Sequence, residues 1–296
     1  MAQRDWEDVY HKIVSADENF LFSLTENTFF PSERDANPFD ISSVNISAVQ
    51  LNKDKPGQWI PIYKKEDLPK FFIDNNIMPV RAGPAEFFFY HCDVFYDVST
   101  CRFLEIDTQK ILPIESFVPS TLKSDFQRNE NAFLNKAVAL GYINHFLEAS
   151  DFIKIFEHEI HTKHHKRLLY GQFGKIKMTK DLLFKTTKGD KIIRSGFLFE
   201  IDLVLESEDE IIIFEAKSSE RGVSSFSLLQ LYYPLIYIQA ILTGLDKEKK
   251  IRTIFIDIIS DNTMEEYKLI EFDFKNNCFD QSNVIKSCIY KSTRML

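Results

Sequence analysis

Glycine and proline are scarce in this chain of 296 residues, which contains 9 Gly and 10 Pro but 28 Phe. Because these two residues mark turns and flexible linkers, their scarcity argues against a string of small modules. The core is expected to be packed with aromatic rings instead. A content of 44% hydrophobic and 27% charged residues is typical of a globular protein and excludes a disordered chain.

Long apolar runs and paired cysteines are also missing. The longest apolar run, 232–242, is interrupted by Pro234 and Gln239 and is far shorter than the roughly 20 residues that a membrane-spanning helix needs. The charged N-terminus has no apolar run after it, so no signal peptide is predicted. Four cysteines without a CxxC pair do not make a disulfide framework. Together these absences predict a cytoplasmic protein with reduced thiols and no membrane partner.

The net charge of −8 is unevenly distributed along the chain. Residues 151–195 contain eleven Lys or Arg against five Asp or Glu, together with four of the seven His. A local excess of positive charge is typical of a surface that contacts a nucleic-acid backbone. His158 and His161 also have a spacing that suits zinc, but no Cys lies near them and the HExxH spacing is absent. The predicted DNA-binding residues are Lys166, Arg167, Lys175, Lys177, Lys191 and Arg194.

The hydrophobic pattern predicts an α/β or α+β fold, in which helices flank a mixed central β-sheet. A stretch with two prolines, 113–123, is the best candidate for a domain boundary. Before it we expect a helix over 66–75 and a Phe- and Tyr-rich hairpin over 80–105. After it we expect helices over 128–147 and 224–243, the second closed by Gly244, and strands over 195–205, 211–217, 252–259 and 267–274.

One predicted hairpin, 197–217, carries charged residues that its apolar neighbours do not explain. If Glu206 pairs with Ile211, Asp202 lies directly across from Glu215, with Cβ atoms about 4.5–5.5 Å apart. Glu200 then lies across from Lys217. By alternation, one face of the hairpin is wholly apolar and is expected to be buried. The apolar face is formed by Phe197, Phe199, Ile201, Leu203, Leu205, Ile212, Phe214 and Ala216.

The opposite face of this hairpin brings two carboxylates and one ammonium together. Two opposed carboxylates repel each other and destabilise a sheet, so a compensating cation is expected. Oxygen ligands suit Mg²⁺, which binds through one or two carboxylates together with water and substrate phosphate. The alternative is an exposed, salt-bridged face, which the apolar flanking residues disfavour.

The spacing of these residues resembles a known nuclease signature. Asp202, a spacer of twelve residues and the sequence Glu215-Ala-Lys217 resemble the motif of the PD-(D/E)xK nuclease superfamily, with Ile201 in place of the motif's proline. The segment 226–234 is similar to the one that follows the catalytic lysine in certain type II restriction endonucleases. There a glutamine faces the active site, and Gln230 is its counterpart here.

The resemblance also implies roles for individual residues. Asp202, Glu215 and the Ala216 carbonyl would bind Mg²⁺, and Glu130, on the helix before the sheet, would complete the metal site. The catalytic residues would then be Asp202, Glu215, Lys217 and Gln230, with Lys217 orienting the attacking water. Alternatively, Glu130 is an acid favoured by the positive end of the helix dipole, and Gln230 is a polar residue on a buried helix.

At the level of the whole protein, the resemblance implies a restriction-endonuclease-like core over 121–296. Residues 1–120 would serve DNA recognition or dimerisation. The expected activity is that of a Mg²⁺-dependent type II restriction enzyme cutting double-stranded DNA. Its expected partners are a second copy of the chain and a cognate DNA methyltransferase. Two alternatives are a repair or recombination nuclease that reads DNA structure, and a catalytically silent DNA-binding module.

Overall fold

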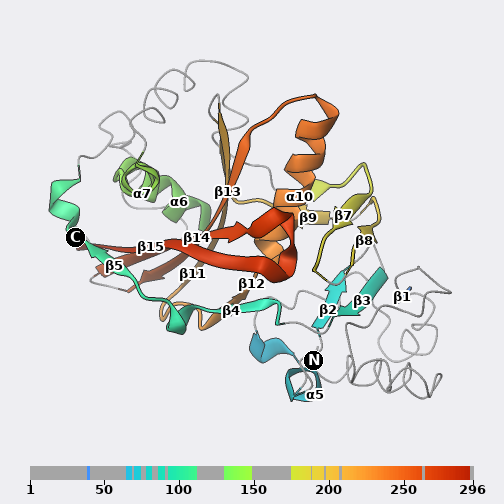
Figure 1. The fold of residues 1–296 in the computed structure, drawn as a ribbon. Helices are drawn as coiled ribbons and strands as arrows, with labels where there is room; N and C mark the ends of the chain where they lie inside the picture. Colours follow the sequence, from blue (N-terminus) through green and yellow to red (C-terminus); the bar gives the residue numbers. More distant parts are fainter. Residues whose placement is uncertain are drawn as a thin grey trace.

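The computed structural model describes residues 39–40, 65–68, 70–74, 78–81, 86–90, 93–111, 130–148, 175–187, 189–196, 198–206, 209–261 and 264–293. Its centre is a six-stranded sheet in the order β10-β11-β13-β14-β15-β5 (Figure 1). The strands are β5 (Leu104–Ile106), β10 (Leu203–Glu206), β11 (Glu210–Ser219), β13 (Lys250–Ser260), β14 (Met264–Phe274) and β15 (Ser282–Thr293). Two neighbouring pairs, β11–β13 and β15–β5, are parallel and the other three are antiparallel. The predicted α+β fold with a mixed sheet is confirmed.

Helices cover both faces of this sheet (Figure 1). On one face lie α6 (Glu130–Ala139) and α7 (Tyr142–Leu147), and on the other lies α10 (Leu229–Gly244). The predicted helix 128–147 is therefore two helices, because Gly141 has a left-handed φ of 74° between them. The apolar stripe predicted for this segment is buried against the sheet, and it consists of Phe133, Leu134, Ala137 and Val138.

The second predicted helix begins later than the sequence pattern indicates. Ser225–Ser227 form β12, which pairs with β4 (Phe95–Asp97), and α10 starts at Leu229. Gly244 was expected to close the helix after Thr243, but it is the last helical residue and Leu245 is the C-cap. A strand that pairs with a distant partner has overridden the local helical pattern at residues 224–228.

The strands predicted over 211–217, 252–259 and 267–274 are confirmed as β11, β13 and β14. The hairpin predicted over 80–105 is wrong. Instead β2 (Met78–Arg81) pairs with β3 (Glu86–Tyr90), which also pairs with β1 (Phe39–Asp40), whereas β4 and β5 pair with β12 and β15. The helix predicted over 66–75 is reduced to α5 (Lys70–Asp74) after a short 3-10 turn. The predicted boundary at 113–123 lies outside the described residues.

Two small antiparallel sheets lie beside the central sheet. One joins β6 (Lys175–Lys177) to β9 (Leu198–Glu200), and the other joins β7 (Leu182–Phe184) to β8 (Lys191–Ile193). The predicted strand 195–205 is therefore divided at Ile201 and Asp202 into β9 and β10, which belong to different sheets. Among the described residues, no helix has the length and apolar character that crossing a bilayer requires.

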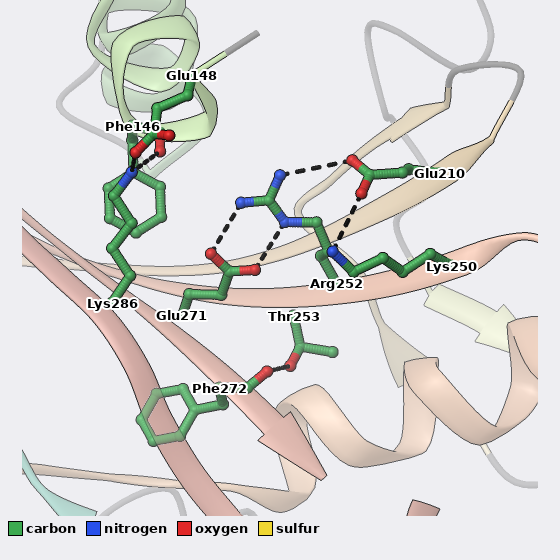
Figure 2. Close-up of polar contacts among 9 residues, drawn as sticks. All are labelled: Phe146, Glu148, Glu210, Lys250, Arg252, Thr253, Glu271, Phe272 and Lys286. Carbon is green, nitrogen blue, oxygen red and sulfur yellow. Dashed lines mark hydrogen bonds and ion pairs between the residues drawn. The ribbon is translucent and has the colours of Figure 1, made fainter. Parts of the chain in front are cut away.

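Ion pairs join the strands at the end of the sheet where β11 and β13 begin (Figure 2). The Arg252 guanidinium binds both carboxylate oxygens of Glu271, at 2.6 and 2.8 Å. It also contacts Glu210, which Lys250 approaches to 3.3 Å. On β15, the Lys286 ammonium donates to the Phe146 carbonyl near the end of α7. These contacts tie neighbouring strands, and α7, to one another.

Candidate active site

The candidate site lies where the pairing of β10 with β11 ends, while β11 continues beside β13. The register predicted for the hairpin is confirmed, since Glu206 pairs with Ile211 and Leu203 pairs with Phe214. The ladder ends there, however. In the described part of the chain, β11 beyond Phe214 therefore has no partner strand on the β10 side, which leaves main-chain groups for side chains to bind.

Carboxyl groups occupy this uncovered edge. Asp202 is the residue before β10, and its Oδ2 accepts a hydrogen bond from the Ala216 N–H at 2.7 Å. Two residues further along β11, the Ser218 main chain hydrogen-bonds to the Glu130 carboxylate at the start of α6. Asp202 and Glu130, two of the predicted metal ligands, therefore reach the same edge of β11, although they lie far apart in the sequence.

One part of the predicted geometry is wrong. Glu200 was expected across from Lys217, but it belongs to β9 and pairs with Lys175. Asp202 is likewise not part of an intact ladder, yet its carboxyl group is within hydrogen-bonding reach of Glu215. The break after β9 also moves Phe199 and Ile201 to the α10 side of the sheet, away from the apolar face on which they were expected.

Glu215 is the most deeply buried acid of the site, with 4% of its surface exposed. Its Oε1 accepts hydrogen bonds from Lys217 Nζ and from Gln230 Nε2, each at 2.5 Å. Burial raises the pKa of Glu215 to about 8, and the negative charges of Asp202 and Glu130 add to that effect against the opposing Lys217. Near neutral pH this carboxyl group therefore holds a proton unless a further cation compensates its charge.

Asp202 and Glu130 show the same trend. Burial raises the pKa of Asp202, against the Ala216 hydrogen bond and the charge of Lys217, and Glu200 raises it further. Burial also raises the pKa of Glu130. The charge of Lys217 lowers this pKa, and the charge of Asp202 raises it further. Three neighbouring carboxyl groups therefore all resist ionisation, because they repel one another in a poorly solvated place.

Lys217 is the cation of this cluster. Its ammonium contacts Glu215 Oε1 at 2.5 Å and the Ala216 carbonyl at 3.1 Å. Burial alone would lower the pKa of Lys217, but the surrounding carboxyl groups outweigh burial and raise it. Lys217 therefore stays charged, and it leaves the cluster with an excess of negative charge once the three acids ionise.

Gln230 lies in the first turn of α10 and faces the site, as predicted. Its Nε2 donates to Glu215, whereas its Oε1 is buried and has no hydrogen-bond partner within the described segments. A buried acceptor without a donor is costly, so this oxygen marks a place where a bound water or another donor fits.

The donor set fits a hard divalent cation. Asp202, Glu215, Glu130 and the Ala216 carbonyl offer only oxygen ligands, which Mg²⁺ prefers. Over the residues that the structure describes, no three His, Cys, Asp or Glu side chains already lie at the spacing of metal ligands. Glu215 Oε1 is held by Lys217 and Gln230, and these contacts would have to be exchanged for the metal.

The predicted DNA-binding residues are placed in part. Lys177 is exposed on β6, next to the strand that leads into Asp202, and Lys175 is on the same strand. Lys191 is partly buried, which lowers its pKa, and Arg194 pairs with Asp181 at 3.5 Å. Lys166, Arg167 and the His-rich stretch lie outside the described residues.

Asp257 is a buried acid that the sequence reasoning missed. It is fully buried on β13, where it lies in register with Lys217 on the neighbouring parallel strand. The signal was present in the sequence, since Asp257 is the one acid in an otherwise apolar run, 254–259. A lone carboxylate in a buried strand requires a partner, and here the partners are the Val223 N–H and, at 3.8 Å, Lys268.

Comparison with known proteins gives one match. A family model described as a domain of unknown function (DUF6997) matches residues 98–291, which is well over half of the chain. The matched region contains every residue of the candidate site. No curated protein and no solved structure matches the chain.

Proposed function

We propose that this chain, which belongs to the DUF6997 family of domains of unknown function, is a Mg²⁺-dependent endonuclease acting on double-stranded DNA. One observation carries the proposal: three carboxyl groups and one ammonium gather at the uncovered edge of β11, with a main-chain carbonyl beside them. The resemblance of Asp202, Glu215 and Lys217 to the PD-(D/E)xK signature supports the same chemistry.

Asp202, Glu215, Glu130 and the Ala216 carbonyl would hold the metal. When bound, Mg²⁺ supplies positive charge that polarises the scissile phosphate and makes a water more acidic. The excess of negative charge in the cluster favours a divalent cation at this place. Burial raises the pKa of Glu215, and the negative charges of Asp202 and Glu130 add to that effect, so a proton compensates part of the charge when metal is absent.

Lys217 and Gln230 would act on the reacting groups. The Lys217 ammonium already lies against the Ala216 carbonyl and Glu215, so it can orient the attacking water and stabilise charge that develops on the phosphate. Gln230 fixes Glu215 through its Nε2, and its free Oε1 can accept a hydrogen bond from the same water.

The finer proposal is sequence-specific cleavage in a restriction system. Strand β6, which carries Lys175 and Lys177, runs beside β9 and so brings positive charge close to Asp202. Residues 1–120 would contribute to base readout and to a two-fold dimer, because sequence is read at base edges and two cuts suit a palindrome. A cognate DNA methyltransferase would protect the host, and the proposed place of action is the cytoplasm.

The test is digestion of a sequenced, unmethylated plasmid by the purified protein with Mg²⁺ or with a chelator. The proposal expects discrete fragments with Mg²⁺ and none with the chelator. Asp202→Ala should abolish cleavage while leaving DNA binding in Ca²⁺ largely intact. A branched oligonucleotide in a parallel reaction examines the structure-specific alternative.

Each outcome has a defined meaning. Cutting of the branched DNA alone, or random nicking of the plasmid, would replace the restriction proposal with a repair nuclease. If the wild-type protein bound DNA without cutting it, the remaining hypothesis would be a catalytically silent DNA-binding module. Cleavage by Asp202→Ala at the wild-type rate would overturn the assignment of the site itself.

A further inference from the structure

The loop 220–224, which follows β11 directly after the candidate site, is held from three sides. The Val223 N–H donates to Asp257 Oδ1 at 3.1 Å, and the Ser224 carbonyl accepts from the Val98 N–H at 2.9 Å. The Ser224 hydroxyl donates to Glu66 at 2.7 Å. Contacts to β13 and to two segments before residue 100 therefore fix a loop that its length alone would leave free to move.

Gly222 brings the loop close to β13. Its φ is 77°, a left-handed conformation that favours glycine, and a Cβ at this position would lie 2.8 Å from Asp257 Oδ2. It would also lie 3.0 Å from Ile259 Cδ1. Any larger residue would push the loop away from Asp257, so the sequence at this position preserves a close approach.

Arg221 is the cation of this fixed loop, which also exposes Glu220 and Ser224 to solvent. It is exposed, and it has no ion-pair partner among the described residues. It follows Lys217 by four residues, which span at most about 14 Å of extended chain. An arginine fork suits phosphate, and a fixed backbone lowers the entropy lost when the side chain is ordered.

We propose that Arg221 binds a backbone phosphate of the DNA near the scissile phosphodiester, and that Asp257 and Gly222 position the loop that carries it. The inference rests on the proposed function. Asp257 is a positioning residue in this scheme, because it touches the loop backbone and not the DNA. Its place in register with Lys217 ties the position of the loop to the strand that carries the site.

The test measures binding of a short fluorescent duplex in Ca²⁺ over a range of salt concentrations. Arg221→Gln should weaken binding about tenfold and reduce the slope of log affinity against log salt by about 0.9, the value for one lost phosphate contact. The matched control is Lys247→Gln, which removes an exposed positive charge just after the C-terminal end of α10. The loop that carries Arg221 precedes the other end of this helix, which is about 24 Å long. The control should keep the wild-type slope.

Two further variants separate the charge from its position. Arg221→Lys should keep the salt slope and lose only part of the affinity, because the charge remains and the fork is lost. Gly222→Ala should lose affinity as Arg221→Gln does, although it retains the guanidinium, because the loop is displaced. The melting temperature of each variant shows whether it is folded, and the exposed Arg221 variants should melt with the wild type.

The two levels of the proposal fail in different ways. Plasmid cleavage by the wild-type protein together with an unchanged salt slope in Arg221→Gln would overturn the role of Arg221 alone. Equal losses of DNA affinity in Arg221→Gln and Lys247→Gln would also overturn it, because any exposed positive charge would then contribute equally wherever it lies. Failure of the wild-type protein to cleave would overturn the proposed function whatever the slopes are.

Discussion

The two ends of β11 differ in the balance between their acidic and basic side chains. At its beginning, two carboxylates meet two cations, and the Arg252 guanidinium forms a two-point contact with Glu271 (Figure 2). At its other end, three carboxyl groups surround one ammonium. The residues of the first end are Glu210, Lys250, Arg252 and Glu271, and those of the second are Glu130, Asp202, Glu215 and Lys217.

The difference separates charges that stabilise the fold from charges kept for another purpose. Charges taken out of water are tolerated when each has a partner of opposite sign and matched hydrogen bonds, as Arg252 and Glu271 do. The second cluster lacks this balance, and burial together with the charges of Asp202 and Glu130 raises the pKa of Glu215 to about 8. A fold that keeps an unbalanced cluster pays for it in stability, which is what an active site that awaits a cation is expected to do.

The largest expected effect is on cleavage. Lys217→Met removes the ammonium that we propose orients water and stabilises charge, so under the proposed function the cleavage rate should fall by about 10²–10⁴-fold. Lys250→Met, which removes a lysine from the balanced end of the same sheet, is the control and should cut at the wild-type rate. Initial rates on supercoiled plasmid measure both. A Lys217→Met rate within a few-fold of the wild type would show that the ammonium has no catalytic role.

The next effect is on stability, and it should have opposite sign at the two ends of β11. Glu271→Gln leaves the buried Arg252 without its main partner and should lower the free energy of unfolding by about 3 kcal/mol. Above pH 8, where Glu215 is ionised, Glu215→Gln removes one charge from a cluster that has too many, so unfolding of the metal-free protein should cost as much as in the wild type or more. Chemical denaturation in the presence of a chelator compares the two, and a similar loss in both variants would remove the distinction.

The smallest effect, measured per pH unit, is a dependence of stability on pH. The pKa of Glu215 is raised from an ordinary value of 4.5 to about 8, so the folded protein holds a proton that the unfolded chain releases between these values. The contribution of Glu215 to the free energy of unfolding is fully present below pH 4.5 and is lost as the pH rises to about 8. Relative to Glu215→Gln, the metal-free wild type should lose at most about 1.4 kcal/mol per pH unit within this window. Parallel profiles of the two proteins from pH 5.5 to 8.5 would contradict the raised pKa.

Much of the site could be predicted because it depends on local patterns. Alternation in the hairpin fixed which residues of β11 face α10, and the turn between Glu206 and Ile211 set the register that the structure confirms. These two constraints bring Asp202, Glu215 and Lys217 together. Glu130 and Gln230 were assigned to the site through the resemblance to the nuclease superfamily, and they lie at the starts of α6 and α10.

The parts that could not be predicted depend on distant pairing. Nothing within 195–205 shows that Leu198–Glu200 leave the hairpin to pair with β6, because the hydrophobic pattern continues through the break. The same holds for β12 and β5, which form only because β4 and β15 lie beside them. Asp257 was visible as an acid in an apolar strand, but its contact with the loop at Val223 requires the fold.

The central claim is that the carboxyl cluster at the end of β11 binds a divalent cation, and calorimetric titration of the metal-free protein with Mg²⁺ tests it most directly. The wild type should take up Mg²⁺ with release of protons at pH 7, because Glu215 must ionise to bind. Glu271→Gln, if folded, should bind as the wild type does, whereas Glu215→Gln and Asp202→Ala should lose the binding. No heat of binding in the wild type, or equal binding by wild type and Glu215→Gln, would contradict the claim.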